Sequence, residues 1–385
     1  MPKPRIVFLV NGDSSSAMGI RAQSFQERLA LDFRIEIAYR SGNRIGAMLR
    51  FFGMLVRLRP SLCYVFDMGY SGVMAAGLYR LISRSRMIVD TGDAIHALSE
   101  SAGERGRLGR LLTKWLERFG LAISDRVVVR SRPHQEMLAE QGIDAAAIPD
   151  AVDVEQFSPR DETGLRRKYG LEGAVVIGVM GSLIWNPRWQ MCYGWELIEL
   201  VRLLKDKPVK GFIIGDGSGL AHLKAQCAAA GIEDRIVFAG RVPYAELPRF
   251  INLMDICLST QTNDVPGRVR TTGKLPIYLA CGRFVLSSDV GEAARVLPRE
   301  MLVAYNGTKD LEYPTRLAQR IEPMLGHPEI WQRPGRSVAI AEEHFDYKVV
   351  AEKLRQVIDG VLATASEQEA PASAAPRKAE KGQVR

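Results

Sequence analysis

Short apolar runs rich in β-branched residues alternate along the chain with stretches of helical periodicity, and this alternation restricts the fold more than any other feature. Five runs occupy the first half, at residues 6–10, 35–39, 62–66, 87–90 and 126–129. Five more occupy the second half, at residues 174–178, 211–214, 236–238, 256–258 and 284–287. The pattern predicts an α/β protein with two doubly wound parallel sheets. Ligands bind such sheets beyond the carboxyl ends of the strands, so we expect a site in a cleft between two halves.

The chain of 385 residues is long enough for two such domains. Residues 148–173 carry prolines, glycines and charges without strong periodicity, which is typical of an interdomain linker. Apolar residues at helical spacing from Val350 to Val361 predict a closing amphipathic helix, and the Ala, Pro, Glu and Lys residues that follow predict disorder. The predicted boundaries are 1–160 for the first domain, 161–345 for the second, 346–363 for the closing helix and 364–385 for a disordered tail.

The composition, with 46% hydrophobic and 25% charged residues, is that of an ordinary globular protein. The five cysteines include no CxxC pair and have no neighbouring His pair, so neither a zinc site nor a disulfide framework is predicted. The longest uncharged stretch, residues 173–187, contains Gly, Asn and Pro, so we expect no transmembrane helix. These features favour a protein of the reducing cytoplasm.

One candidate phosphate site is the glycine-rich turn in the segment GFIIGDGSGL, residues 211–220, where a predicted strand leads into a predicted helix. Glycine lets the backbone approach a ligand closely, and a helix N-terminus offers free amide groups to phosphate. The alternative is an ordinary strand-to-helix turn, which occurs in any α/β protein.

A second candidate is the loop that carries Arg268, Arg270 and Lys274 around Gly273, with the Thr272 hydroxyl nearby. Several cations with hydroxyl groups make a suitable seat for a diphosphate. A solvated loop explains each cation taken alone, but the cluster favours phosphate binding.

Several segments together resemble glycosyltransferase family 4, whose members have the GT-B fold and use nucleotide-sugar donors. They are PDAVDVEQFSP in the linker, GDGSG, IVFAGRVPYAELPRFINLMDICLST and KLPIYLACGRFVLSSDVGE. In the first half, VDTGDAIH and SDRVVVRSRPHQEML agree more loosely. The resemblance implies two Rossmann-like domains that face a cleft, with the acceptor on the first and the nucleotide-sugar on the second.

The resemblance also implies roles for individual residues. Arg188 and Lys274 would lie against the donor diphosphate and act in catalysis, and Asp93 and His96 fall near the family's acceptor-side Asp and His. For His96, a purely structural role remains the alternative. Together with the loop residues, the predicted donor-binding set is Gly19, Gly215, Asp216, Gly217, Arg268, Arg270, Thr272, Gly273 and Glu292.

The chain departs from the family at one pair of positions. Two glutamates separated by seven residues normally hold the donor sugar and the ribose, and this chain has Val269 and Ile277 there. The cations Arg268, Arg270 and Lys274 would take over part of that task by binding the diphosphate.

The implied activity is transfer of a sugar from a nucleotide-sugar to a carbohydrate or lipid-linked acceptor in the synthesis of a surface polysaccharide or glycolipid. The resemblance implies retention of anomeric configuration, without a metal ion or another cofactor. Two alternatives stay open: a catalytically silent GT-B scaffold that binds nucleotide without turnover, and a sugar-nucleotide epimerase.

The formal net charge of +8 is unevenly distributed. Residues 44–62 and 106–120 mix Arg and Lys with large apolar residues, as helices on an anionic membrane surface do. The alternative is two ordinary helices packed on the sheet with solvated Arg faces. We therefore expect a cytoplasmic protein, with peripheral contact to the inner face of a membrane as the second interpretation. No nucleic-acid-binding module is recognisable, so nucleic acid is not an expected partner.

Overall fold

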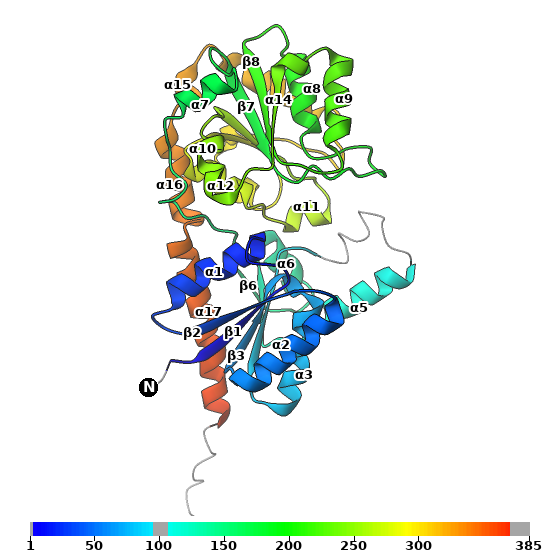
Figure 1. The fold of residues 1–385 in the computed structure, drawn as a ribbon, viewed down its shortest axis with the longest axis vertical. Helices are drawn as coiled ribbons and strands as arrows, with labels where there is room; N and C mark the ends of the chain where they lie inside the picture. The colour runs from blue at the N-terminus through cyan, green and yellow to red at the C-terminus, as the bar shows by residue number, and fades with distance from the viewer. Residues whose placement is uncertain (1–2, 95–106, 370–385) are drawn as a thin grey trace, which may run out of the picture.

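The computed structural model describes residues 3–94 and 107–369, and within them it has two six-stranded parallel sheets, one in each half of the chain. The strand order is β2-β1-β3-β4-β5-β6 in the first sheet and β12-β11-β10-β7-β8-β9 in the second. In both orders the chain direction across the sheet reverses beside the first strand, which is the doubly wound pattern. The predicted α/β fold with two Rossmann-like halves is therefore confirmed (Figure 1).

The strands have the following bounds. The first sheet contains β1 (Arg5–Val10), β2 (Arg34–Tyr39), β3 (Leu62–Val65), β4 (Arg86–Thr91), β5 (Arg126–Val129) and β6 (Ala145–Ala147). The second contains β7 (Val175–Met180), β8 (Val209–Ile214), β9 (Ile236–Gly240), β10 (Ile256–Ser259), β11 (Phe284–Ser288) and β12 (Leu302–Val303).

The helices connect and cover these strands. Those before the linker are α1 (Ala17–Leu29), α2 (Arg44–Leu58), α3 (Tyr70–Ile82), α5 (Arg107–Ile123) and α6 (Arg132–Ala139). The later ones are α7 (Thr163–Lys168), α8 (Trp195–Leu203), α9 (Leu220–Ala230), α10 (Leu247–Ile251), α11 (Val265–Val269), α12 (Lys274–Ala280), α13 (Ala293–Val296), α14 (Tyr313–Ile321), α15 (Pro328–Trp331), α16 (Pro334–His344) and α17 (Tyr347–Glu369). Short 3₁₀ turns lie at Phe66–Met68, Glu233–Arg235, Tyr244–Glu246, Arg299–Met301 and Glu322–Met324.

All ten strands expected from the apolar runs are present, with bounds that differ by at most a few residues. Two edge strands were not predicted. The sequence of β6 is Ala-Ala-Ala, which has no β-branched residue, and β12 is only two residues long. Both pair with one neighbour at the edge of a sheet, so the preceding strand defines them more than their own sequence does.

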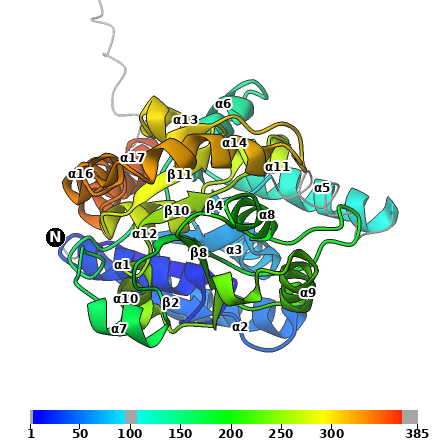
Figure 2. The same cartoon turned by 90° about the horizontal axis from the view of Figure 1, so that it is seen from above.

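The closing helix α17 packs against the first half although it follows the second half in sequence. Its residues Val350, Leu354, Ile358 and Val361 share a buried cluster with Phe25 of α1. Figures 1 and 2 show α16 and α17 running along one side of the molecule. The helix extends to Glu369 and so includes residues 364–369, which the sequence assigned to the tail; residues 370–385 lie outside the described part.

The chain crosses between the two halves at two places that bond to each other. Val152 in the linker donates its amide to the carbonyl of Phe345, and the amide of Tyr347 donates to the carbonyl of Val152. Because both crossings are joined side by side, they form a narrow connection on the side of the molecule that carries α17.

None of the helices in residues 3–94 and 107–369 combines the length and the apolar character needed to cross a lipid bilayer.

Candidate active site

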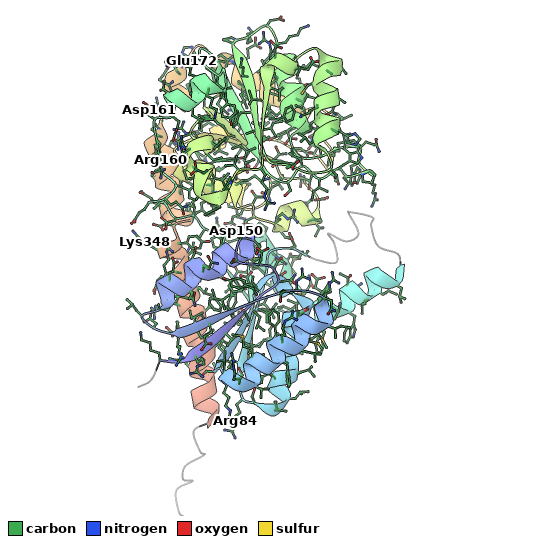
Figure 3. All side chains as sticks on the ribbon, in the orientation of Figure 1. Arg84, Asp150, Arg160, Asp161, Glu172 and Lys348 are labelled. Carbon is green, nitrogen blue, oxygen red and sulfur yellow. The ribbon has the colours of Figure 1, made fainter. Side chains whose placement is uncertain are left out.

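A cleft of about 1210 Å³ lies where the carboxyl ends of the two sheets face each other, and both halves line it. The first half contributes Arg21, Arg130 and Asp150, the last of which Figure 3 shows at the junction of the halves. Of the predicted site residues, Arg270, Thr272, Gly273 and Lys274 line the cleft. Together with Thr271, which also lines the cleft, these four form one continuous stretch of chain that leads into α12.

Lys274, the first residue of α12, is a half-buried cation that lines this cleft. Its Nζ lies 3.5 Å from the centre of the Tyr193 ring, in a cation–π contact. Burial lowers the pKa of Lys274 to about 8; Glu196 acts against this shift and Arg270 acts with it. An ammonium group that has lost most of its water binds an incoming anion more strongly than a solvated one does.

The first half holds the loop before Lys274 through three consecutive residues. Ser131 Oγ donates to the carbonyl of Val269 at 2.5 Å. Arg270 Nε donates to Asp93 Oδ1 at 2.6 Å, and Thr271 Oγ1 donates to Asp150 Oδ2 at 3.2 Å. The cation loop of the second half is therefore positioned by groups of the first half.

Asp93 lies just after β4, where strand ends face the cleft, and pairs with Arg270 across the junction. The sequence predicted it as an acceptor-side residue, and the structure adds its contact with the donor-side loop. The second acceptor-side candidate, His96, lies outside the described residues.

The predicted turn Gly215-Asp216-Gly217 lies beside the cleft and does not line it. Gly215 has φ +138°, and a Cβ added there would lie 1.9 Å from the carbonyl oxygen of Gly181. Gly217 has φ +155°, and its Cβ would lie 2.5 Å from the carbonyl oxygen of Leu183. Asp216 is exposed, and its carboxylate accepts the amide of Gly217. The glycines thus allow close packing against residues 181–183, of which Gly181 and Ser182 line the cleft.

Four further predicted residues also lie outside the cleft lining. Arg188 is exposed, with its guanidinium 5.3 Å from the centre of the Trp189 ring. Arg268 is exposed and donates to Asn263. Gly19 lets the start of α1 approach the loop before it, since its Cβ would lie 2.2 Å from a backbone oxygen of that loop.

Glu292 is buried in the contact between the halves. Its carboxylate accepts both the backbone amide of Arg132, at 2.7 Å, and Nε of the same residue, at 2.8 Å. A carboxylate at the start of α6 also compensates the free amides and the positive dipole end of that helix. The donor-binding roles assigned to Glu292, Gly19 and Arg268, and the catalytic role assigned to Arg188, therefore stay predictions.

The sequence analysis missed a buried charge network at the base of the cleft. Arg21 donates to Asp90 and to the linker carbonyls of Ile148 and Pro149, and Tyr64 also donates to Asp90. Arg130, which follows β5, lies 3.5 Å from Asp90 and donates to Asp67. Two of these groups were detectable in principle, because Asp90 lies near the end of one strand and Arg130 directly follows another.

The apolar residues that replace the two expected glutamates are also buried in the structure. Val269 is 3% exposed, and Ile277 is 7% exposed and lines the cleft. Within residues 3–94 and 107–369, no group of three or more His, Cys, Asp or Glu side chains is arranged to hold a metal ion.

Comparison with known protein families gives a match in the second half of the chain. Residues 174–325 match the family model described as Glycosyl transferases group 1. These residues are therefore similar to a glycosyl transferases group 1 domain. The matched segment contains the cation loop, Lys274 and the second sheet, and membership of glycosyltransferase family 4 stays an expectation.

Two curated relatives are glycosyltransferases. The chain is 30% identical over 126 residues to 2-deoxystreptamine glucosyltransferase of Streptomyces kanamyceticus, which covers 31% of each protein. It is 27% identical over 194 residues to the phosphatidylinositol N-acetylglucosaminyltransferase GPI3 subunit of Saccharomyces cerevisiae, which covers 48% of this chain and 40% of the relative. The matches thus span about a third of the length of these relatives.

Similar solved structures cover nearly the whole chain. Sucrose-phosphate synthase from Thermosynechococcus elongatus has a TM-score of 0.75 at 15% identity, over 94% of this chain and all of the other. Anabaena Alr3699/HepE in complex with UDP-glucose has a TM-score of 0.70 at 16% identity, over 93% of this chain and all of the other. At these identities the likeness establishes the fold, and the predicted GT-B arrangement is confirmed.

Proposed function

We propose that this protein is a glycosyltransferase that moves a sugar from a nucleotide-sugar donor to a carbohydrate or lipid-linked acceptor. The observation that carries the proposal is the desolvated Lys274 ammonium beside Arg270, in a cleft that the matched segment shares with the first half. The Anabaena neighbour that binds UDP-glucose supports a nucleotide-sugar as the donor class.

The proposed chemistry requires stabilisation of the negative charge that develops on the departing nucleoside diphosphate. Lys274 and Arg270 are cations held in place before the reaction, and such groups stabilise charge more effectively than mobile water does. The leaving phosphate would assist the incoming hydroxyl, so the transfer would proceed with retention and without a metal ion. Asp93, which accepts a hydrogen bond from Arg270, would connect the acceptor side of the cleft to the cations that bind the diphosphate.

A titration of thermal stability with nucleotides tests the function. We expect UDP, GDP, ADP, CMP or dTDP, or one of their sugar conjugates, to raise the melting temperature selectively. At a concentration 100 times Kd, a ligand stabilises the native state by about 2.7 kcal/mol. A protein that melts cooperatively and responds to none of these ligands contradicts the proposal.

The catalytically silent scaffold is the second candidate, and the apolar Val269 and Ile277 favour it. A nucleotide that shifts melting, combined with no consumption of its sugar conjugate in the presence of acceptors, would select the scaffold. Epimerised donor in the absence of acceptor would select a sugar-nucleotide epimerase.

We further propose that the acceptor is presented at an anionic membrane surface on the cytoplasmic side. The protein would bind this surface peripherally through α5 and α2. On α5, Leu108, Leu111 and Trp115 are 81%, 65% and 54% exposed, next to the exposed Lys114 and Arg118. Figure 1 shows this helix extending from the side of the first half. Apolar groups at the headgroup boundary and cations on lipid phosphates would together hold the protein.

Co-sedimentation with vesicles tests the membrane contact. The parent should bind phosphatidylglycerol vesicles more strongly than phosphatidylcholine vesicles, and added salt should weaken binding. The variant with Leu108→Ser, Leu111→Ser and Leu112→Ser should lose most of this binding because it removes exposed apolar area. A matched variant with Leu203→Ser and Leu311→Ser changes exposed leucines of the other half and should bind normally. Equal binding by both variants would reject α5 as the contact.

A further inference from the structure

Three polar side chains with buried polar atoms lie in the second half, and one of them interacts with Lys274. Glu196, the second residue of α8, is 1% exposed. Thr260 follows β10, and Tyr313 begins α14, which packs on α8. Among the described residues, Glu196 Oε1, Thr260 Oγ1 and the Tyr313 hydroxyl are buried atoms without a hydrogen-bond partner at good geometry. A buried polar atom without a good hydrogen bond lowers the stability of the fold, unless it interacts favourably with a nearby charge.

Of these three residues, Glu196 is the one that interacts electrostatically with Lys274. Tyr193, three residues before Glu196, holds its ring against Nζ of Lys274, and a Cβ at Gly181 would lie 3.4 Å from the same Nζ. The start of α8 and the start of α12 therefore meet at the ammonium group. Thr260, which lines the cleft, lies close enough to interact with both Glu196 and Tyr313.

The charges around Lys274 come from two elements. Glu196 of α8 favours the charged ammonium, and Arg270 of the preceding loop disfavours it. Around Glu196 itself, the backbone amides of Gly194 and Glu196, the Thr260 hydroxyl and Lys274 favour the carboxylate, while burial disfavours it and raises its pKa. In the part of the chain that the structure describes, Glu196 is thus the acid that favours the charged form of this lysine.

We propose that Glu196 is a positioning residue for the donor diphosphate: its carboxylate keeps the Lys274 ammonium charged and directed along the Tyr193 ring into the cleft. The inference rests on the proposed function and adds a residue that does not line the cleft. It also explains why a carboxylate is retained among aromatic and aliphatic side chains, where burial alone favours an apolar residue.

Diphosphate binding should depend on pH in a way that follows from the charge of Lys274. The ammonium of Lys274 is charged below its pKa of about 8, so diphosphate affinity should fall as pH rises through that value. Replacing Glu196 by glutamine removes the group that opposes desolvation and keeps the side-chain volume. The pKa of Lys274 should then decrease further, and affinity should be lost at a lower pH.

Calorimetric titration with inorganic pyrophosphate from pH 6.5 to pH 9 tests the inference on the full chain. Glu196→Gln should bind roughly tenfold more weakly than the parent at pH 8.5 and about equally at pH 6.5. The matched control is Glu199→Gln, a half-buried glutamate on the same helix that pairs with Arg202; it should follow the parent curve. A Glu196→Gln profile that coincides with the parent's overturns the inference.

A second variant keeps the test decisive if Glu196→Gln does not fold. Lys274→Arg carries a guanidinium that stays charged throughout this range, so its pyrophosphate affinity should no longer fall between pH 7.5 and pH 9. If the fall persists, another group causes it and the inference is wrong. A parent protein that binds neither pyrophosphate nor any nucleoside diphosphate at any pH would reject the proposed function, and the inference with it. A pH-dependent parent with an unaffected Glu196→Gln variant would reject only the inference.

Discussion

Lys274→Ala is expected to weaken binding of the matching nucleoside diphosphate by more than 100-fold, a loss of about 3 kcal/mol or more. The variant removes a desolvated cation whose Nζ lies on the Tyr193 ring in the cleft, and leaves the diphosphate beside Arg270 alone. Calorimetric titration with the nucleotide that raises the melting temperature measures the effect. The fold should persist, because Glu196 keeps its interactions with the Thr260 hydroxyl and with backbone amides when Lys274 is removed.

Lys224→Ala is the matched control for this change. Lys224 also lies over an aromatic ring, with Nζ 5.7 Å from the centre of Phe238, but it is exposed on α9. Its removal should leave nucleotide affinity within about twofold of the parent, since an exposed cation contributes little. Unchanged affinity in a folded Lys274→Ala protein would remove this residue from the site.

Gly215→Ala is expected to destabilise the protein by about 3 kcal/mol or more, or to prevent folding. A Cβ there lies 1.9 Å from the carbonyl oxygen of Gly181, and the φ of +138° is one that L residues rarely adopt. The carbonyl oxygen of Gly181 belongs to the backbone, and a Cβ cannot move without its own backbone. Rotating a side chain therefore cannot relieve the clash. Urea unfolding followed by circular dichroism measures the loss.

The control for this prediction is Gly164→Ala in α7, where an added Cβ has nothing within 4 Å. That variant should be as stable as the parent or slightly more stable, since alanine favours helix over glycine. The result that contradicts this account is a Gly215→Ala variant as stable as the parent, with only its nucleotide affinity changed. The turn would then face the ligand directly, and its packing role would be wrong.

The cation loop shows how far sequence reasoning reaches at a site. Arg270, Thr272, Gly273 and Lys274 were predicted from their clustering, and all four line the cleft. Their neighbour Arg268 was predicted on the same ground and points to Asn263 instead. Arg268 lies in α11 and Arg270 follows it, and each side chain bonds to a different partner, Asn263 or Asp93, which composition does not reveal.

Glu292 illustrates the same limit across the two halves. Its partner Arg132 is separated from it by 160 residues, and only the contact between the halves brings them to 2.7 Å. Glu196 was missed for the opposite reason. It lies in a helix with ordinary periodicity, and its importance depends on Lys274 of another helix, which approaches it only in the folded domain.

The sequence by itself determined the two parallel sheets, the order of their strands and helices along the chain, and the stretch that carries the cations. These features follow from local periodicity, because apolar residues spaced by two or by 3.6 specify strands and helix faces without reference to distant residues. Only the tertiary structure decided that α17 packs on the first half, that the glycine turn supports residues 181–183, and that the first half holds residues 269–271. Each of these depends on contacts between segments far apart in sequence, which form when apolar faces and buried charges find partners in the folded chain.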